Sequence, residues 1–233
     1  MKPILFNTEM VRAILDGRKT VTRRIVKLPK NIKEQPDGMY TINTEGDCYE
    51  DCYLDGLYAD GYLLPKYKVG DILYVRETWN ICNMHIDADE NAEYNSITFI
   101  YKTGKDESET ANTVNVTTEL YDKYDRSMAE NNPEWRSSAT MPKSAARIFL
   151  KVTDIRVERL QDITEEQAIK EGFTDNRGFI HSPQDEYDNI HSAKQGFYSL
   201  WDSTVKDDSQ KWESNLWVWV IEFKRCEKPE GWC

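Results

Sequence analysis

The 233-residue chain is long enough for one large domain or two small ones, and its 39% hydrophobic and 30% charged residues are typical of a globular protein. No apolar stretch approaches the roughly 20 residues that a membrane-spanning helix needs, and 12% aromatic residues argue against full disorder. The net charge of −11 makes the chain a poor general binder of nucleic acid, because phosphate contacts dominate that affinity.

The charge is unevenly distributed along the chain. Residues 1–35 hold nine Lys or Arg against three Asp or Glu, so the remaining residues carry a net −17. A basic patch in an acidic chain predicts a single anionic or nucleotide-sized ligand, or equally a solvated basic face with no partner. Five cysteines, and a first segment without the apolar run of a secretory signal, predict reduced thiols and a cytoplasmic location.

The first residues predict a strand, a helix and a second strand. Asn7 or Thr8 can cap the helix, and Gly17 is placed to end it. The β-branched residues that follow favour a strand. The three elements are expected at residues 3–6, 9–16 and 20–26.

The rest of the chain alternates clear elements with polar stretches, and a break is expected near Asp154. A capping box at Thr164 opens a short helix that Gly172 can close. Strands are expected at residues 69–79, 97–102, 145–152, 155–160 and 217–224, a helix at 192–203, and irregular insertions at 27–66, 103–140 and 173–191.

These elements predict the fold class. About six short strands with three short helices indicate an α+β protein. We expect a small mixed β-barrel with short helices packed on it and long irregular insertions, rather than a doubly wound sheet. The whole chain, residues 1–233, is expected to form a single domain.

The segment Gly17-Arg18-Lys19-Thr20-Val21-Thr22-Arg23-Arg24 is the first candidate for chemistry, with four cations in seven residues. Positive charges this close together favour loss of a proton from the residue with the lowest pKa among them. Lysine, unlike arginine, can lose its proton, so Lys19 is a candidate general base for a neighbouring hydroxyl. On a strand, Thr22 and Arg24 share one face and Arg23 lies on the other. The alternative is an exposed, charged first strand.

Glu77 is a second candidate, near the end of the strand expected at residues 69–79. Alternation places Glu77 with Val75 and Trp79 on an otherwise apolar face. A carboxylate there needs a partner, and an arginine from the basic segment is expected to supply one. Such a pair can serve catalysis, or it can simply tie two strands together.

Glu171 is a third candidate, at the end of the helix that begins after Thr164. The helix dipole disfavours a carboxylate at a C-terminus, so this position hints at a compensating interaction. An ordinary exposed glutamate is the alternative.

Four further residues are possible zinc ligands: Cys48, Cys52, Cys82 and His85. Their spacing departs from the tight C-x2-C pattern. Unlinked thiols in two polar loops are the favoured interpretation, so no metal and no cofactor are expected.

The residues Ile14-Leu15-Asp16-Gly17-Arg18-Lys19-Thr20-Val21-Thr22-Arg23-Arg24 resemble the opening motif of the ASCH domain, a family of the PUA-like β-barrel superfamily. Two further segments resemble longer ASCH proteins, which are often encoded in phage and prophage regions. They are Arg76-Glu77-Thr78-Trp79, which ends the strand expected at residues 69–79, and Met141–Arg147. The other similar blocks are residues 69–79, 160–172 and 217–224, and the three insertions have no family counterpart.

This resemblance implies a pocketed barrel that handles RNA or a modified nucleoside. Small bacterial members are acetylcytidine amidohydrolases that use a lysine, a threonine and a glutamate. By motif, these fall on Lys19, Thr22 and Glu171, which are therefore the expected catalytic residues. The chain departs from the small members at Arg24 and in its insertions. The expected ligand-binding residues are Arg18, Arg23, Arg24, Arg76, Glu77, Trp79 and Arg147.

As an enzyme, the chain would use Lys19 to take a proton from Thr22, whose oxygen attacks the acetyl carbonyl carbon of acetylcytidine. Glu171 would orient Lys19 or deliver the proton to the leaving amine. Arg76 or a backbone N–H would stabilise the oxyanion.

Two other hypotheses use the same pocket differently. A non-catalytic RNA- or nucleotide-binding module, or a ribonuclease of phage origin, would hold phosphate on its arginines and stack a base on Trp79. In an interaction protein with unspecified protein partners, the acidic residues 37–60 would cover the basic patch.

Overall fold

The computed structural model describes residues 1–34, 39–43, 48–59, 61, 63–86, 95–103, 111–130, 134–173 and 192–231. The chain forms two compact units, each assembled from stretches that are distant in sequence. The first unit contains Met1–Gly17, Ile72–Lys151 and Arg225–Cys233, and the second contains Arg18–Asp71 and Val152–Lys224.

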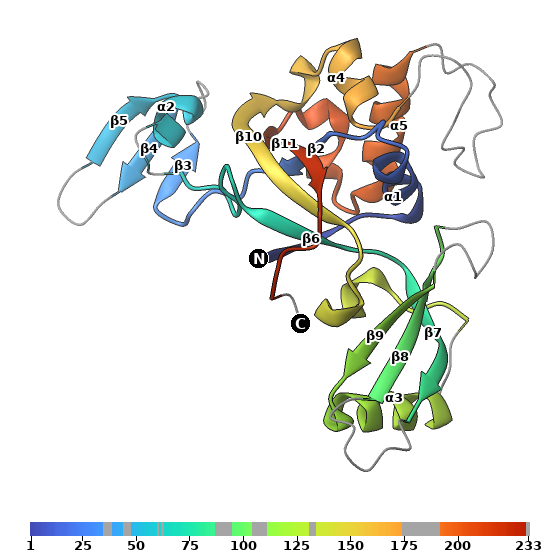
Figure 1. The fold of residues 1–233 in the computed structure, drawn as a ribbon. Coiled ribbons are helices and arrows are strands. Elements are labelled where there is room, and N and C mark those ends of the chain that lie inside the picture. The colour runs from blue at the N-terminus through green and yellow to red at the C-terminus, as the bar shows by residue number, and fades with distance from the viewer. Residues whose placement is uncertain are drawn as a thin grey trace. The chain divides into compact units, whose positions relative to one another are not determined.

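Strands and helices are mixed along the chain, which confirms the α+β class (Figure 1). The strands are β1 (Lys2–Leu5), β2 (Val21–Ile25), β3 (Ile32–Glu34), β4 (Tyr40–Asn43), β5 (Cys48–Cys52), β6 (Ile72–Arg76), β7 (Trp79–His85), β8 (Asn95–Tyr101), β9 (Asn112–Val116), β10 (Phe149–Arg159) and β11 (Trp217–Cys226). Among the described residues they form sheets of order β1-β6-β10-β11-β2, β3-β4-β5 and β7-β8-β9. These orders describe open sheets, and closure into a barrel stays a prediction.

The helices are short. In the described ranges they are α1 (Thr8–Leu15), α2 (Leu54–Ala59), α3 (Thr118–Glu130), α4 (Glu165–Lys170) and α5 (Ala193–Thr204), with 3-10 turns η1 (Ser138–Thr140), η2 (Lys143–Ala145), η3 (Leu160–Asp162), η4 (Asp208–Gln210) and η5 (Trp212–Ser214). Within these ranges, none has the length and apolar character needed to cross a bilayer.

In the first unit, the predicted signals set both ends of α1. The Asn7 side chain accepts a hydrogen bond from Met10 N at 2.8 Å. Gly17 follows the helix with a φ of +76°, a conformation that glycine adopts without strain. Arg12 Nε donates to Thr103 O at 3.1 Å, which joins α1 to the residues after β8.

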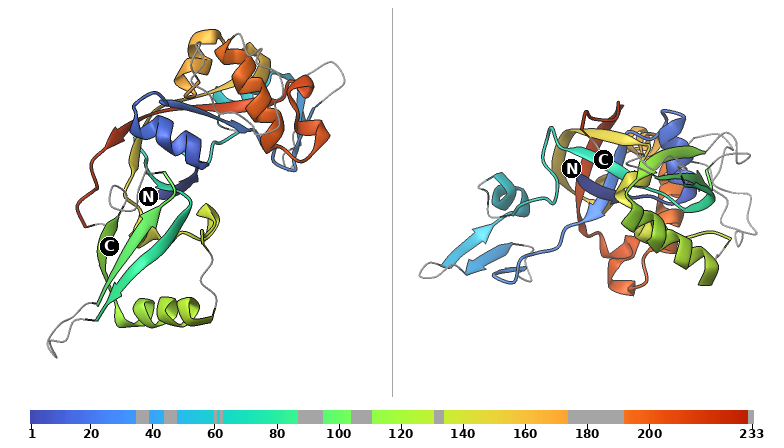
Figure 2. Two further views of the ribbon diagram at one scale, coloured as in Figure 1. Left: turned by 90° about the vertical axis from the view of Figure 1, so that its right-hand side faces the viewer. Right: turned by 60° about the horizontal axis from the view of Figure 1, so that its bottom comes forward.

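One hydrophobic core cluster of the first unit combines residues of the β7-β8-β9 sheet and of α3 with residues near the start of β10. Helix α3 packs against this sheet (Figures 1 and 2). The Trp79 ring lies 5.6 Å from the Phe99 ring and 5.9 Å from the Tyr124 ring, measured between centroids. The prediction that residues 103–140 are irregular is therefore wrong, because this stretch holds β9 and α3. Tyr121 and Tyr124 are both buried, at the three-residue spacing of one helix face.

In the second unit, β2 pairs antiparallel with β11, with Thr22 opposite Ile221. The predicted capping box opens α4: Thr164 Oγ1 accepts from Gln167 N at 3.2 Å, and Thr164 N donates to Gln167 Oε1 at 3.0 Å. Gly172 follows α4 with a φ of +106°, as expected for the end of a helix.

The second unit also holds the β3-β4-β5 sheet and α2, so the prediction that residues 27–66 lack regular structure is wrong. Tyr40 and Ile42 of β4 are fully buried, although polar Thr41 separates them and Asn43 follows them in the sequence. Tyr58 of α2 meets Trp219 of β11 in an edge-to-face contact, with ring centroids 5.1 Å apart. Of the insertion expected at residues 173–191, residues 174–191 lie outside the described residues.

Two predicted strand boundaries are corrected. β10 runs without a break through Asp154, because the charges of Asp154 and Arg156 are two residues apart on one face and pair with each other at 2.9 Å. Trp79 does not end the strand that holds Val75: β6 ends at Arg76, and Trp79 begins β7.

Candidate functional site

The side chain of Lys19 lies buried between the start of β2 and the end of α4. Thr20 N donates to Lys170 O at 2.8 Å, which aligns the chain before β2 with the last residues of α4. Lys19 Nζ donates to Glu171 Oε2 at 2.5 Å, to Val21 O at 2.7 Å and to Glu171 O at 2.9 Å. Three acceptors match the three N–H donors of an ammonium group. The geometry therefore holds a protonated lysine against a carboxylate.

Both members of this pair are buried, Lys19 and Glu171 each being 3% exposed. Burial is the main influence on Lys19 and lowers its pKa, because an ammonium is poorly solvated away from water. The Glu171 carboxylate opposes this effect, whereas the positive charges of Arg24 and Arg23 add to it. The pKa of Lys19 is lowered as a result, because burial outweighs the attraction to Glu171.

Arg23 holds the other oxygen of the same carboxylate. Its Nη1 donates to Glu171 Oε1 at 3.2 Å, and its Nη2 donates to Gln167 Oε1 at 2.9 Å and to Glu158 Oε2 at 3.1 Å. Gln167 and Glu171 are four residues apart, so they lie on the same face of α4 and both reach Arg23. The Arg23 Cζ lies 5.8 Å from the centre of the Phe197 ring. Arg23 thus fixes the orientation of Glu171.

Thr22 is 4% exposed on β2. It neighbours Arg23 in an extended strand, so the two side chains leave opposite faces of the sheet. Within the described ranges, no hydrogen bond joins the Thr22 hydroxyl to Lys19 or Glu171. The structure therefore brings the amine and the carboxylate together, and in the described part of the chain neither is hydrogen-bonded to the Thr22 hydroxyl.

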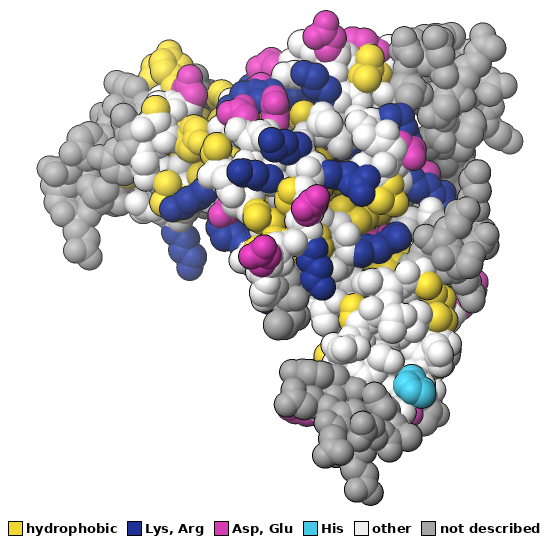
Figure 3. Space-filling model, viewed as in Figure 1, with side chains coloured by type: hydrophobic (Ala, Val, Ile, Leu, Met, Phe, Trp, Pro, Cys, Tyr) yellow, Lys and Arg dark blue, Asp and Glu magenta, His cyan; other side chains and the backbone are white. Residues whose placement is uncertain are grey.

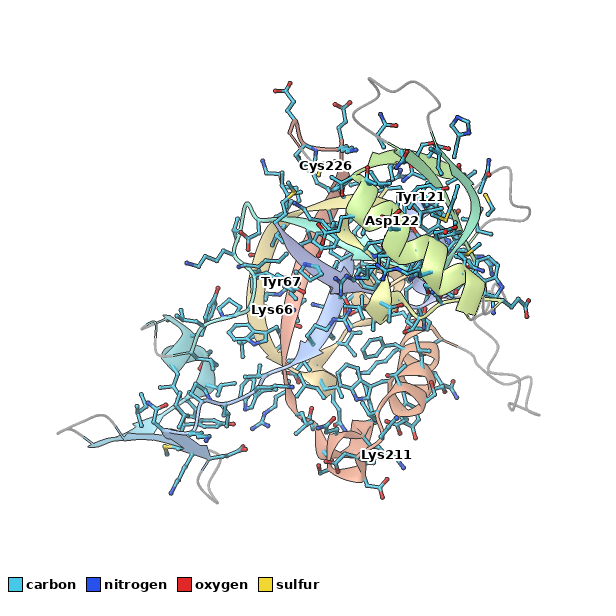
Figure 4. The ribbon with its side chains drawn as sticks, turned by 90° about the horizontal axis from the view of Figure 1, so that it is seen from below. Lys66, Tyr67, Tyr121, Asp122, Lys211 and Cys226 are labelled. Atoms are coloured by element: carbon cyan, nitrogen blue, oxygen red, sulfur yellow. The ribbon has the colours of Figure 1, made fainter. Side chains whose placement is uncertain are left out.

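Two further cations of the basic segment are at the surface. Arg18 is exposed, and its Nη1 donates to Gly172 O at 2.8 Å. Arg24 is exposed and interacts electrostatically with Tyr67, which lies beside Lys66 (Figure 4). Burial raises the pKa of the Tyr67 phenol, and the positive charge of Arg24 partly offsets that rise. These two arginines leave positive charge near Lys19 within reach of a ligand.

The remaining expected residues lie in the first unit. Glu77 is fully buried and pairs with Arg147, which donates from Nε to Oε1 at 3.0 Å and from Nη2 to Oε2 at 2.9 Å. Thr103 Oγ1 donates to Glu77 Oε2 at 3.0 Å and accepts from Arg147 Nη2 at 2.7 Å. An arginine does pair with Glu77, but the prediction that the basic segment supplies it is wrong. The partner stands just before β10, which is paired with β6.

Trp79 and Arg76 are held by their own unit. Trp79 is 1% exposed, and its Nε1 donates to Ser137 O at 3.1 Å. Arg76 Nη1 donates to Ala139 O at 3.1 Å, and its Cζ lies 5.8 Å from the Tyr74 ring centre. The Trp79 ring is therefore packed in the core, where it has no exposed face on which a base could stack.

Metal ligands do not gather in the described part of the chain, where no group of three or more His, Cys, Asp or Glu is placed to hold an ion. Cys82 and His85 are exposed on β7. The side chains of Cys48 and Cys52 lie outside the described residues, so the zinc hypothesis stays open for them.

Sequence reasoning missed Glu158 and the side-chain role of Gln167. Gln167 was visible as the third residue of the capping box, but that signal concerns the helix end and not the contact with Arg23. Glu158 carried a weaker signal, a charge repeated every second residue along β10, from Asp154 through Arg156. Both residues act on the buried pair through Arg23.

Comparisons with known proteins give no assignment: no family model, no curated protein and no solved structure matches the chain.

Proposed function

We propose that this chain is an ASCH-type protein of PUA-like barrel architecture that binds a modified nucleoside and hydrolyses an amide on its base, with acetylcytidine as the substrate. The proposal is supported by the sequence motif around Lys19 and by the meeting of Lys19 with Glu171. A small ligand suits the charge of the chain better than a long RNA, because a net −11 repels an extended phosphate backbone.

The buried contact between Lys19 Nζ and Glu171 Oε2 is the observation that carries the proposal. A fully buried ion pair contributes little net stability, because the loss of solvation offsets the attraction between the charges. Its two members form a pair through which a proton can move, and burial lowers the pKa of the amine. Such a perturbed lysine beside a fixed carboxylate is typical of a general base.

In this mechanism, the Lys19 proton first moves to Glu171 and leaves a neutral amine. That amine takes the proton of the Thr22 hydroxyl while the oxygen attacks the acetyl carbonyl carbon. The carbon–nitrogen bond to the base then breaks, and the leaving amine receives a proton from Lys19. Water hydrolyses the acetyl ester on Thr22 and releases acetate. This mechanism requires substrate binding to bring the Thr22 hydroxyl within reach of Lys19, since no hydrogen bond joins the two groups in the described part of the chain.

The test is release of cytidine from acetylcytidine, followed by chromatography. Thr22→Val removes the hydroxyl with little change of volume and should lower turnover at least about 100-fold, whereas Thr22→Ser should retain part of it. Glu166→Gln, an exposed change on α4, is the control and should leave turnover unchanged. Absence of turnover in the unmodified protein, or full turnover in Thr22→Val, would overturn the proposal.

A binding module without catalysis is the second candidate, and one observation favours it. All three N–H groups of Lys19 already have acceptors, and the Thr22 hydroxyl is not one of these three. Binding would then rest on Arg18 and Arg24 at the surface. Saturable, salt-sensitive binding of acetylcytidine monophosphate without turnover, lost in Arg18→Gln or Arg24→Gln, would identify this function.

A further inference from the structure

A line of alternating charges leads from the surface of β10 to the buried Lys19. It begins at Arg156, passes through Glu158 to Arg23, and reaches Lys19 through Glu171. Exposure of the side chains falls along this line, from 32% at Arg156 to 20% at Glu158 and 0% at Arg23. On the face drawn in Figure 3, Lys and Arg side chains are interspersed with Asp and Glu.

At the outer end, three carboxylates surround Arg156. Its Nη1 donates to Asp154 Oδ2 at 2.9 Å and to Glu222 Oε1 at 2.7 Å, and its Nε donates to Glu158 Oε1 at 2.5 Å. Burial lowers the pKa of the Arg156 guanidinium, but these contacts outweigh that effect, raise the pKa and keep the group charged. Arg156 is therefore a fixed positive charge whose position is set by β10 and β11.

Glu158 is the link between this surface cluster and the interior. One of its oxygens accepts from Arg156, and the other, Oε2, accepts from Arg23 Nη2 at 3.1 Å. Gln167 Nε2 donates at 3.5 Å to Glu158 Oε1, the same oxygen that accepts from Arg156. Glu158 thus compensates part of the Arg23 charge.

Arg23 links Glu158 to the buried pair of Lys19 and Glu171. It contacts Glu171 Oε1 at 3.2 Å, while Glu171 Oε2 holds Lys19. In the described part of the chain, the charged groups that act most strongly on Lys19 are Glu171 from the end of α4, and Arg23 and Arg24 from β2. Charges in a buried site are screened less than those in water, so a change at Glu158 reaches Lys19.

We propose that Glu158 and Arg156 are positioning residues that control, from the surface of β10, how readily Lys19 gives up its proton to Glu171. The consequence for turnover rests on the proposed function, but the control of Lys19 itself does not. In the described part of the chain neither residue is hydrogen-bonded to Lys19, and both act through Arg23 and Glu171.

The alternating signs predict opposite effects from neighbouring members of the line. Glu158→Gln removes a negative charge and leaves Arg23 less compensated, so the pKa of Lys19 should fall by about half a unit. Arg156→Gln removes a positive charge and leaves Glu158 free to compensate Arg23 more fully, so the pKa of Lys19 should rise by a similar amount. Arg156→Lys keeps the charge and should leave the pKa of Lys19 unchanged.

The experiment is an NMR titration of the full chain with lysines labelled at Cε, in which Lys19→Arg identifies the Lys19 signal. Glu166→Gln and Arg126→Gln make the same chemical changes at exposed positions and should leave the Lys19 titration unchanged. Shifts of the same sign in Glu158→Gln and Arg156→Gln, or no shift in either, would overturn the proposal.

The design separates this proposal from the proposed function. If Glu158→Gln does not fold, the comparison of Arg156→Gln with Arg156→Lys at the partly exposed end still gives a decisive result: equal Lys19 titrations would overturn the proposal. The titration needs no substrate, so a protein without deacetylase activity but with the opposite shifts would refute only the enzymatic function. Turnover with no shift of Lys19 would refute only the control from β10.

Discussion

Glu77 and Arg147 are 70 residues apart in the chain and form a two-point ion pair between the end of β6 and the start of β10. Glu77 is fully buried, whereas 19% of the Arg147 side chain is exposed. The Arg147 Cζ also lies 4.2 Å from the centre of the Tyr101 ring, so the guanidinium contacts both the Tyr101 ring and the Glu77 carboxylate. This arrangement is suited to joining β6, β8 and β10 within the first unit.

We predict that Glu77→Gln destabilises the protein by about 3 kcal/mol, because it leaves the Arg147 charge partly buried without a carboxylate. The double variant Glu77→Leu with Arg147→Met should be more stable than Glu77→Leu alone, since no uncompensated charge remains. Urea unfolding of the single and double variants measures both effects. Arg126→Met, at an exposed position of α3, is the control and should change stability by less than about 0.5 kcal/mol. Simple additivity of the two single changes would contradict the pairing.

We predict that the capping box of α4 and the Arg23 contact can be separated by mutation. Thr164→Ala removes one acceptor at the helix start and should cost about 1 kcal/mol, and Thr164→Ser should restore it. Gln167→Ala also removes the acceptor for Arg23. It should therefore lower the free energy of unfolding more than Thr164→Ala does, and it should also shift the titration of Lys19. Chemical denaturation and the Lys19 titration together test this. An equal loss of stability in Thr164→Ala and Gln167→Ala would show that the Arg23 contact contributes nothing.

We predict a specific loss of stability at alkaline pH from Tyr101. Its hydroxyl donates to Ala145 O and accepts from Asn112 Nδ2, and burial raises the pKa of the phenol. A raised pKa in the folded state means that the stabilisation is complete below about pH 10, where the unfolded phenol titrates, and is lost as the pH rises above it.

Tyr101→Phe should therefore be about 1 kcal/mol less stable than the unmodified protein at pH 8, and this difference should shrink by about 1 kcal/mol by pH 11. Urea unfolding at pH 8, 10 and 11 measures the difference. Tyr198→Phe, at the surface of α5, is the control for loss of a phenol hydroxyl and should change stability at pH 8 by less than about 0.5 kcal/mol. A constant difference for Tyr101→Phe would contradict the prediction.

Local signals in the sequence were reliable. The caps at Asn7 and Thr164 and the glycine after α1 act within one helical turn, so they do not depend on the rest of the fold. The contact of Lys19 with Glu171 is not local, and it was expected only because a family motif places a lysine and a glutamate at these positions.

Contacts that depend on strand register could not be predicted. Arg147 reaches Glu77 because β10 and β6 pair in one register, and a shift by one residue would turn the arginine to the other face. For the same reason Glu158 could not be assigned to Arg23. The break expected near Asp154 is wrong, because Asp154 and Arg156 pair on one polar face of an unbroken β10.

Gln167 and Glu171 are useful to the site only because one helical turn separates them, and α4 contains just six residues. One residue added or removed between them would rotate the carboxylate by about 100° around the helix axis, away from both cations, while the cap and the helix survived. Evolution can therefore substitute residues on the solvent side of α4 freely, but it cannot change the length of α4.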